Sequence, residues 1–326
     1  MKDLFGREVS NLRISVTQRC NLDCLYCHRE GQPSIGAGVD HVVVSRHVSV
    51  EVGADPVEMS AEDIEKIASV GAKLGIKKVK ITGGEPLLRK DIVEIVSRLS
   101  KIVEEVSLVT NGMLLERLAG ELKSAGLSRV NISLDSFDPD NYKKIVGGES
   151  LPKTVRGVKA AHDAGLTPVK LNMVVMRGIN SSEIWKMLDF ARNSNAILQL
   201  IELETTKQGV DEELYRKYHY DLSGVEGKLK KMAKKVVERD VNRRKKYILR
   251  NGDGMAEVEV VKPMHNTEFC GACTRIRLTS DGKLKPCLLR NDNLVDILTP
   301  LRGGASEGEL KNIFRKAVVL REPYWH

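Results

Sequence analysis

The chain has 326 residues, of which 41% are hydrophobic, 29% charged and only 4% aromatic, and its formal net charge is +8. This composition is typical of a soluble globular protein with one large domain or two smaller ones, and the positive balance favours an anionic partner. No apolar run is long enough to span a membrane and residues 1–16 lack a secretory signal, so we expect a cytoplasmic chain without a membrane partner. Thiols stay reduced in the cytoplasm, so the six cysteines are predicted to be ligands and not disulfides.

Short runs rich in Val, Ile and Leu alternate with amphipathic stretches over the first two-thirds of the chain. The predicted strands are 12–16, 78–82, 106–110, 130–134, 169–175 and 198–203, and the predicted helices between them are 61–74, 90–102, 114–124, 154–164 and 182–193. Alternation of this kind implies a parallel sheet with helical crossovers. Six repeats are fewer than the eight of a closed barrel. The predicted fold class is therefore α/β, an incomplete (β/α)6 barrel of the TIM type.

The rhythm changes after residue 204. Residues 211–238 are predicted to be a charged helix, and a basic run follows at 243–246. A hairpin is predicted from strands 247–250 and 256–261 around an Asn-Gly-Asp-Gly turn. We therefore expect two regions, 1–204 and 205–326. Residues 31–56 interrupt the first region and are interpreted as a long loop or small hairpin on the site side, of a length that often covers a site or is disordered.

Cys20, Cys24 and Cys27 follow the first predicted strand at the spacing C-x3-C-x2-C. Three thiolates are one short of the four that usually hold an iron–sulfur cluster, which leaves one iron open to a small ligand. Zinc is the alternative, with His28 as a fourth ligand. Structural zinc sites usually begin from a tight C-x2-C pair, which this triad lacks, so the spacing favours iron–sulfur.

A second triad, Cys270, Cys273 and Cys287, has the spacing C-x2-C-x13-C. It does begin with the tight pair, and His265 could supply a fourth zinc ligand. The spacing alone leaves zinc and iron–sulfur equally open here.

The motifs resemble those of a known superfamily. The first triad, with Tyr26 before its third cysteine, and the GGEP turn that ends at Pro86 are similar to the signature of the radical S-adenosylmethionine (SAM) superfamily. The blocks LRISVTQRCNLDCLYC, VKITGGEPLLRKD, VTNG, VNISLD and FCGACTRIRLTSDGKLKPCL together resemble the GTP 3′,8-cyclase (MoaA) family of molybdenum cofactor biosynthesis. These blocks run in order over nearly the whole chain, and CGACTRIR at 270–277 is the most discriminating.

This resemblance implies a reaction and its cofactors. Two [4Fe–4S] clusters and SAM would serve as cofactors, and a C-terminal extension would carry the second cluster and close the barrel mouth. A 5′-deoxyadenosyl radical would take the ribose C3′ hydrogen of GTP, and the C3′ radical would add to guanine C8, giving 3′,8-cyclo-7,8-dihydro-GTP. Implied partners are GTP, a reductant such as flavodoxin or ferredoxin, and a downstream cyclic pyranopterin monophosphate synthase. Whether the chain forms a homodimer is left open.

The resemblance also implies site residues. The first cluster would be held by Cys20, Cys24 and Cys27 and the second by Cys270, Cys273 and Cys287. SAM would contact Tyr26, Gly84 and Ser133. GTP would contact Arg13, Lys78, Lys80, Thr110, Lys170, Arg275, Ile276 and Arg277. The catalytic set would be the first triad with Arg275 and Arg277.

Strand parity supports the basic part of this set without the resemblance. Alternate side chains of a strand point to opposite faces. In five predicted strands one face is polar, and it carries Arg13 and Ser15, Lys78 with Lys80 and Thr82, Asn131 and Ser133, Lys170 and Asn172, or Arg275 and Arg277. The opposite faces are aliphatic. We therefore predict a polar, basic lumen suited to a triphosphate.

Several positions depart from the family pattern. Val109 stands where Thr is common, Gln199 where Arg is common and Glu204 where Met is common. The family often ends in a Gly-Gly tail that reaches the site, whereas this chain ends REPYWH, so no such tail is expected to act.

Two other functions compete with the cyclase. A two-cluster radical SAM enzyme that modifies a peptide would also carry a C-x2-C pair and a lone downstream cysteine. A zinc- or cluster-bearing nucleic-acid-binding protein would explain the net charge and the basic run at 243–246. Such a run is usually solvated, and aromatic platforms for stacking bases are scarce, so nucleic acid is not expected as a partner.

Overall fold

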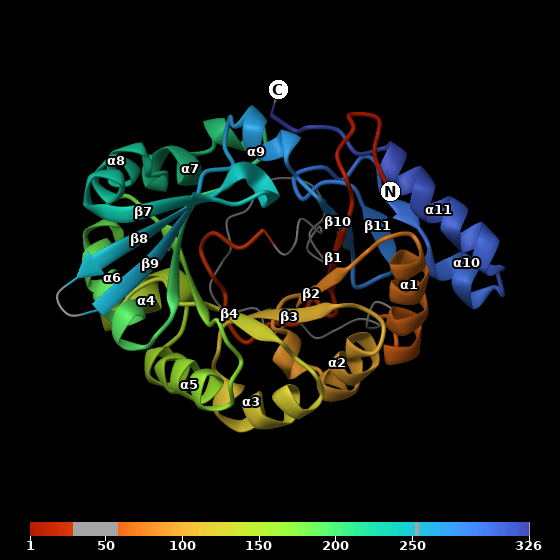
Figure 1. Cartoon of the computed structure of the whole chain (residues 1–326), viewed down its shortest axis with the longest axis horizontal. Coiled ribbons are helices and arrows are strands. Elements are labelled where there is room, and N and C mark those ends of the chain that lie inside the picture. Colours follow the sequence, from red (N-terminus) through yellow and green to blue (C-terminus); the bar gives the residue numbers. More distant parts are fainter. Residues whose placement is uncertain (29–57, 252–253, 326) are drawn as a thin grey trace.

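Six strands that pair in parallel with their neighbours form the first part of the fold. The computed structural model describes residues 1–28, 58–251 and 254–325 (Figure 1), so the loop or small hairpin predicted at 31–56 lies outside the described residues. The strands are β1 (Asn11–Ser15), β2 (Lys78–Thr82), β3 (Glu105–Thr110), β4 (Arg129–Ser133), β5 (Lys170–Val175) and β6 (Ile197–Glu202). None of their ends differs from the predicted one by more than one residue.

Helices connect these strands and cover the outer side of the sheet (Figure 1). They are α1 (Ala61–Lys73), α2 (Ile92–Ser100), α3 (Leu115–Ser124), α4 (Pro139–Val146), α5 (Leu151–Asp163) and α6 (Ile184–Asn193), with short 3-10 turns η2 (Pro86–Leu88) and η3 (Ser181–Glu183). At the start of α1, Ser60 and Asp63 form a reciprocal capping box. Helix α4 was not predicted, although Asp138 caps it and Pro139 occupies its first turn.

The segment after β6 corrects one prediction. The helix expected over 211–238 is broken into η4 (Gly209–Asp211), α7 (Glu213–Tyr218) and α8 (Ser223–Met232), and it ends in the strand β7 (Ala233–Glu238). Strand β7 pairs antiparallel with β8 (Lys245–Asn251), and this ladder outweighs the local helical preference. The predicted hairpin is confirmed, because β8 pairs antiparallel with β9 (Gly254–Val261).

The remaining elements bring the chain back to β1. They are η5 (Val241–Arg243), which precedes β8, and then α9 (Thr267–Gly271), β10 (Arg275–Leu278), β11 (Lys283–Lys285), β12 (Val295–Asp296), α10 (Leu298–Arg302) and α11 (Glu307–Val319). After α11 the last segment runs towards α9. Both chain ends lie in the upper half of the view in Figure 1.

All twelve strands of the described chain belong to one sheet, in the order β12-β11-β10-β1-β2-β3-β4-β5-β6-β9-β8-β7. Strand β10 is parallel to β1 and β9 is parallel to β6, so strands from the second half of the chain extend the six-stranded core at both edges. The sheet curves around a central space (Figure 1). The α/β class and a partial, barrel-like sheet are thus confirmed.

The hydrophobic core lies between the outer face of this sheet and the helices. Leu12 and Ile14 of β1 and Val79 and Ile81 of β2 are almost fully buried there. This leaves the polar positions of the same strands to face the central space. Among the described residues we find no helix that is both long and apolar enough to cross a bilayer.

Candidate active site

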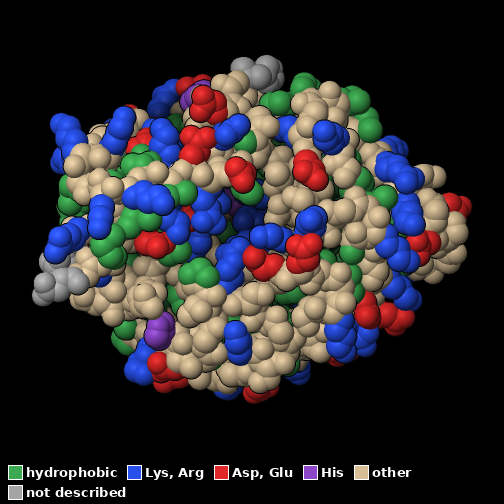
Figure 2. All heavy atoms as spheres, viewed as in Figure 1, with side chains coloured by type: hydrophobic (Ala, Val, Ile, Leu, Met, Phe, Trp, Pro, Cys, Tyr) green, Lys and Arg blue, Asp and Glu red, His purple; other side chains and the backbone are tan. Residues whose placement is uncertain are grey.

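A cavity of about 630 Å³ opens on the inner side of the sheet. Its described lining includes eleven Lys and Arg residues against five Asp and Glu residues. Figure 2 shows the Lys and Arg side chains gathered around this hollow. Such a concentration of positive charge in a partly enclosed space is suited to a polyanionic ligand.

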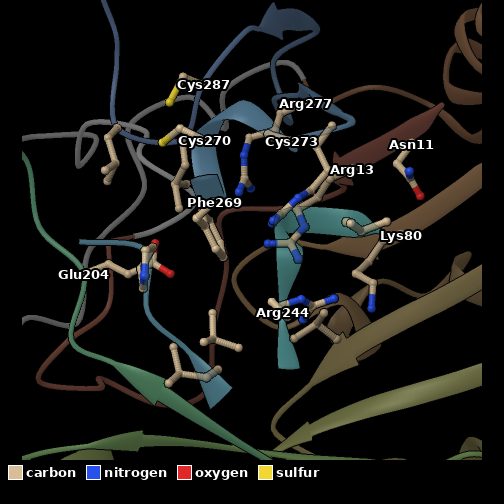
Figure 3. Close-up of a pocket in the computed structure, with 18 of the residues that line it drawn as sticks. Asn11, Arg13, Lys80, Glu204, Arg244, Phe269, Cys270, Cys273, Arg277 and Cys287 are labelled. Atoms are coloured by element: carbon tan, nitrogen blue, oxygen red, sulfur yellow. The ribbon is translucent and has the colours of Figure 1, made fainter. Parts of the chain in front are cut away.

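Strand parity predicts most of this lining, although Ser15 and Thr82, which it also assigns to this face, are buried and do not line the cavity. The cavity is lined by Arg13, Lys78, Lys80, Asn131, Ser133, Lys170, Asn172, Arg275 and Arg277. Figure 3 shows Arg13 and Arg277 side by side, with Lys80 and Arg244 further into the same space. Strand register explains the closeness, because Arg13 is paired with Arg277 on one side and with Lys80 on the other. The predicted basic lumen is confirmed.

Lys80 is held among other cations. Its ammonium group donates a 2.9 Å hydrogen bond to Asn131 Oδ1. Removal from water, reinforced by the charges of Arg129 and Arg13, holds the pKa of Lys80 well below its usual range. A cation that is destabilised in this way gains most when an anionic ligand enters.

Lys170 belongs to a buried charge network on β5, β6 and β9. Its ammonium group lies 2.6 Å from Glu259 Oε1, while Gln199 Nε2 donates to Glu259 Oε2 at 2.9 Å and Arg244 lies 3.6 Å from that oxygen. Burial lowers the pKa of Lys170 to about 8. Burial alone would raise the pKa of Glu259, but the charges of Lys170 and Arg244 lower it to about 2. The one carboxylate therefore orients two cavity cations.

Four arginines that line the cavity keep an unused buried donor in the described structure, and Arg275 and Arg244 are two of them. Arg275 donates to Asn242 Oδ1 and its guanidinium lies 5.8 Å from the ring centre of Phe269. Within the described residues, Arg275 Nε and Arg244 Nε are buried and have no hydrogen-bond partner. A buried N–H without a partner is costly, and an oxygen of a bound anion would satisfy it.

The first cysteine triad lies beside the GGEP turn. Burial raises the pKa of the Cys24 thiol, with further contributions from Asp135, Cys27 and Cys20. Cys20 and Cys27 are exposed. Thiols that resist ionisation on their own and are grouped in threes suit a cationic iron–sulfur cluster, whose binding drives off their protons.

The GGEP turn is fixed by its own contacts. A Cβ atom on Gly84 would lie 2.2 Å from the Arg19 carbonyl oxygen, so only glycine fits against the backbone of the triad segment. The buried carboxylate of Glu85 accepts from Leu87 N at 3.0 Å, Thr110 Oγ1 at 2.7 Å and Asn111 N at 2.8 Å. Burial raises the pKa of Glu85 to about 7.

Tyr26 connects the first triad to the cavity. Its hydroxyl donates to Asp135 Oδ2 at 2.7 Å, and Asp135 Oδ1 accepts from Val174 N at 2.8 Å. Burial raises the pKa of Asp135 to about 6. Tyr26, His28 and Ser133 all line the cavity, whereas the three thiols of the first triad do not.

The second triad lies at the cavity wall. Cys270, Cys273 and Cys287 all line it, and Figure 3 shows Cys287 and Cys270 near one another with Phe269 below them. Burial alone would raise the pKa of Cys273, but Arg275 and Arg321 lower it to about 7. In the part of the chain that the structure describes, no three His, Cys, Asp or Glu side chains converge tightly enough for a single metal ion.

Three predicted contacts lie away from the cavity lining. Thr110 is buried and its hydroxyl donates to Glu85, which makes it a support of the GGEP turn. Ile276 is fully buried on the core face of β10, so its side chain packs in the core and faces away from the cavity. Gly84 is enclosed by the backbone of Gln18 and Arg19.

The chain end also lines the site. It lacks Gly-Gly, yet Arg321, Glu322, Tyr324 and Trp325 line the cavity. The Trp325 and His265 rings are tilted by 45° with their centres 4.2 Å apart. Val109, Gln199 and Glu204, the positions that depart from the family pattern, line the cavity as well.

Sequence reasoning missed five cavity arginines, Arg7, Arg129, Arg239, Arg244 and Arg321. Arg129 has the parity of Asn131 and was missed because the predicted strand began one residue later. Arg244 lies in the basic run that was interpreted as solvated, whereas its side chain is only 20% exposed and points into the cavity (Figure 3).

The fold and the site define the class as a radical SAM protein. The family profile described as "Radical SAM superfamily" matches residues 14–191, and the profile described as "Molybdenum Cofactor Synthesis C" matches residues 196–326. A solved structure of Streptococcus suis SuiB bound to the precursor peptide SuiA shares the fold, with a TM-score of 0.62 and 17% identity over 87% of this chain. This chain spans 60% of the length of SuiB.

Curated relatives match the whole chain. Proteins named "Probable GTP 3′,8-cyclase" from Thermococcus kodakarensis and Pyrococcus abyssi are 49% and 50% identical to it, over 99% of this chain and 99% of each relative. A protein of the same name from Methanocaldococcus jannaschii is 47% identical over 100% of this chain and 99% of its own length. The chain belongs to the GTP 3′,8-cyclase family of the radical SAM superfamily.

Proposed function

We propose that this chain is a GTP 3′,8-cyclase, which converts GTP to 3′,8-cyclo-7,8-dihydro-GTP in the first step of molybdenum cofactor biosynthesis. The observation that carries this proposal is the basic cavity with its unpaired Arg244 and Arg275 donors, placed between the Tyr26 end of the first triad and the second triad. The curated relatives of the same name over the full length support it.

Each region has a proposed role. Residues 1–204 are the incomplete (β/α)6 barrel, in which Cys20, Cys24 and Cys27 hold the first [4Fe–4S] cluster. Residues 205–326 are the extension that closes the mouth, in which Cys270, Cys273 and Cys287 hold the second. When bound, the first cluster and SAM supply a 5′-deoxyadenosyl radical for removal of the C3′ hydrogen of GTP.

SAM is proposed to lie between the GGEP turn and Tyr26. The close approach at Gly84 keeps this turn against the triad segment, and Ser133 lines the cavity. The Tyr26 hydroxyl is fixed by Asp135, so the ring is presented in one orientation. Placing the reacting carbons at near contact is the main contribution that such a site makes to the rate.

GTP is proposed to fill the basic lumen. Arg13, Lys80 and Arg277 lie together and would bind the triphosphate, with Lys78 and Lys170 at its flanks. Bidentate arginine contacts to phosphate are both strong and directional. Arg275 stands next to the second triad and would order the guanine end.

The partners and location of the chain are also proposed. A reductant such as flavodoxin or ferredoxin would supply the electron, and a cyclic pyranopterin monophosphate synthase would take the product. We place the chain in the cytoplasm and leave a homodimer open.

The test is anaerobic turnover with separate substrates. Reconstituted protein is incubated with SAM and reductant, and with GTP, a precursor peptide or single-stranded RNA in separate reactions. We expect a new nucleotide only with GTP, and about seven to eight irons per chain, as two four-iron clusters require. A modified peptide would establish the peptide-modifying alternative, and a colourless protein that contains only zinc would favour the nucleic-acid-binding one.

A further inference from the structure

The two ends of the chain meet at the second cysteine triad. Asp3 Oδ2 accepts a hydrogen bond from Arg7 Nε at 2.8 Å and from Arg321 Nη1 at 2.7 Å. Its other oxygen accepts from the backbone N–H groups of Phe5 and Arg7, each at 3.0 Å. The side chain of Asp3 is fully buried, and those of Arg7 and Arg321 are 6% and 1% exposed.

Each arginine also binds the backbone of a cysteine. Arg7 Nη1 donates to the Cys270 carbonyl at 3.0 Å, and Arg321 Nη2 donates to the Cys273 carbonyl at 2.6 Å. Arg7 and Arg321 are more than 300 positions apart in sequence, yet both donate to the Asp3 carboxylate. The turn that carries the tight cysteine pair is therefore held from both ends of the chain.

One N–H donor group of each arginine has no hydrogen-bond partner among the described residues. In the described structure, Arg7 Nη2 and Arg321 Nε are buried and lack a hydrogen-bond partner, although both residues line the cavity wall that the second triad shares. A folded protein rarely leaves buried guanidinium N–H groups unpaired without a ligand to receive them. Two arginines against one aspartate also leave a net positive charge beside the thiols.

We propose that Asp3, Arg7 and Arg321 form a clamp that positions the Cys270–Cys273 turn and donates hydrogen bonds from Arg7 Nη2 and Arg321 Nε to the sulfurs of the cluster bound there. The proposal rests on the proposed function, since it requires a cluster at the second triad. Hydrogen bonds to sulfur and nearby positive charge favour the reduced, more negative cluster. The clamp thus raises the reduction potential of the second cluster and slows the loss of that cluster from the protein.

The test isolates the second cluster in the full-length chain. Cys20, Cys24 and Cys27 are all replaced by Ser, so that only the second triad can hold iron. After anaerobic reconstitution, we measure the iron content, the midpoint potential and the rate of iron loss to a chelator. The parent is expected to hold about four irons.

Arg321→Met is expected to shift the potential to a more negative value and to speed iron loss by about tenfold, the lower range for loss of a second-sphere contact. Arg321→Lys keeps the charge, so its potential should lie between those of the parent and Arg321→Met. The control is Arg290→Met, which removes a cation that pairs with Asp292 and with Glu322, the residue that follows Arg321. It should leave both quantities unchanged.

Several results would overturn the clamp. A parent without iron would remove both it and the second cluster of the proposed function. A parent with about four irons whose potential is the same in Arg321→Met would refute the clamp alone, as would an equal shift in Arg290→Met. If Arg321→Met does not fold, Arg7→Met decides, because it leaves the Asp3–Arg321 pair in place. Unchanged potentials with weaker GTP binding would assign the two donors to the substrate.

Discussion

Replacement of Glu259 by Gln should destabilise the substrate-free protein by about 3 kcal/mol, because it leaves Lys170 and Arg244 without their shared carboxylate. A pKa of about 2 in place of 4.5 corresponds to about 3 kcal/mol at about 1.4 kcal/mol per pKa unit. Removal of one partner of a buried ion pair costs a similar amount, about 3–5 kcal/mol. For a chain of 326 residues this loss lowers the Tm by about 5 °C.

The assay is thermal unfolding of wild type, Glu259→Gln and Glu257→Gln between pH 7 and pH 3. Glu257 is the matched control, since it lies on the same strand and pairs with Lys246 at 2.5 Å but has a side chain 37% exposed. Its replacement should cost less than about 1 kcal/mol. GTP or tripolyphosphate should restore part of the stability of Glu259→Gln, because phosphate would then neutralise Lys170 and Arg244.

The contribution of Glu259 to folding stability should depend on pH in a definite direction. Because the folded-state pKa of Glu259 lies below 4.5, its contribution is complete above about pH 4.5 and is lost as the pH falls towards 2. The difference in thermal stability between wild type and Glu259→Gln should therefore become smaller below pH 4.5. Equal melting of the two proteins at pH 7, or a gap that stays constant down to pH 3, would refute the assignment of Glu259 as the anchor of the two cations.

Three further substitutions separate the parts of the site. Cys24→Ser should abolish SAM cleavage and halve the iron content, measured as 5′-deoxyadenosine and iron per chain; retention of cleavage would exclude the first triad. Arg275→Ala should leave SAM cleavage in place but raise the KM for GTP by at least tenfold, with Arg216→Ala, an exposed ion-pair residue, as an unchanged control. Gly84→Ala should weaken SAM binding in calorimetry, because its Cβ would lie 2.2 Å from a backbone oxygen; Gly120→Ala, with nothing within 4 Å, should bind normally.

Much of the site could be predicted because strand side chains alternate with a period of two. Once β1, β2 and β5 were recognised, the phase of Arg13, Lys80 and Lys170 followed from the sequence, and the shared register of parallel strands brought them together. Cysteine spacing is equally local. Features of this kind are visible without knowledge of the tertiary structure.

Other parts depend on contacts between distant segments. Arg244 becomes a cavity residue only because β8 and β9 extend the sheet beyond β6, and its local sequence looks like a solvated basic run. The strand β7 forms because β8 is available to pair with it. The tail reaches the cavity because Arg321 finds Asp3 at the other end of the chain. No periodicity within a short window encodes such pairings.

The fate of the C3′ hydrogen of GTP tests the central claim, that one basic cavity brings GTP and SAM together. GTP deuterated at C3′ is incubated anaerobically with the reconstituted protein, SAM and reductant, and both products are weighed by mass spectrometry. The account predicts deuterium in 5′-deoxyadenosine and a nucleotide one mass unit lighter than the labelled GTP. Unlabelled 5′-deoxyadenosine, with the GTP recovered intact, would contradict it.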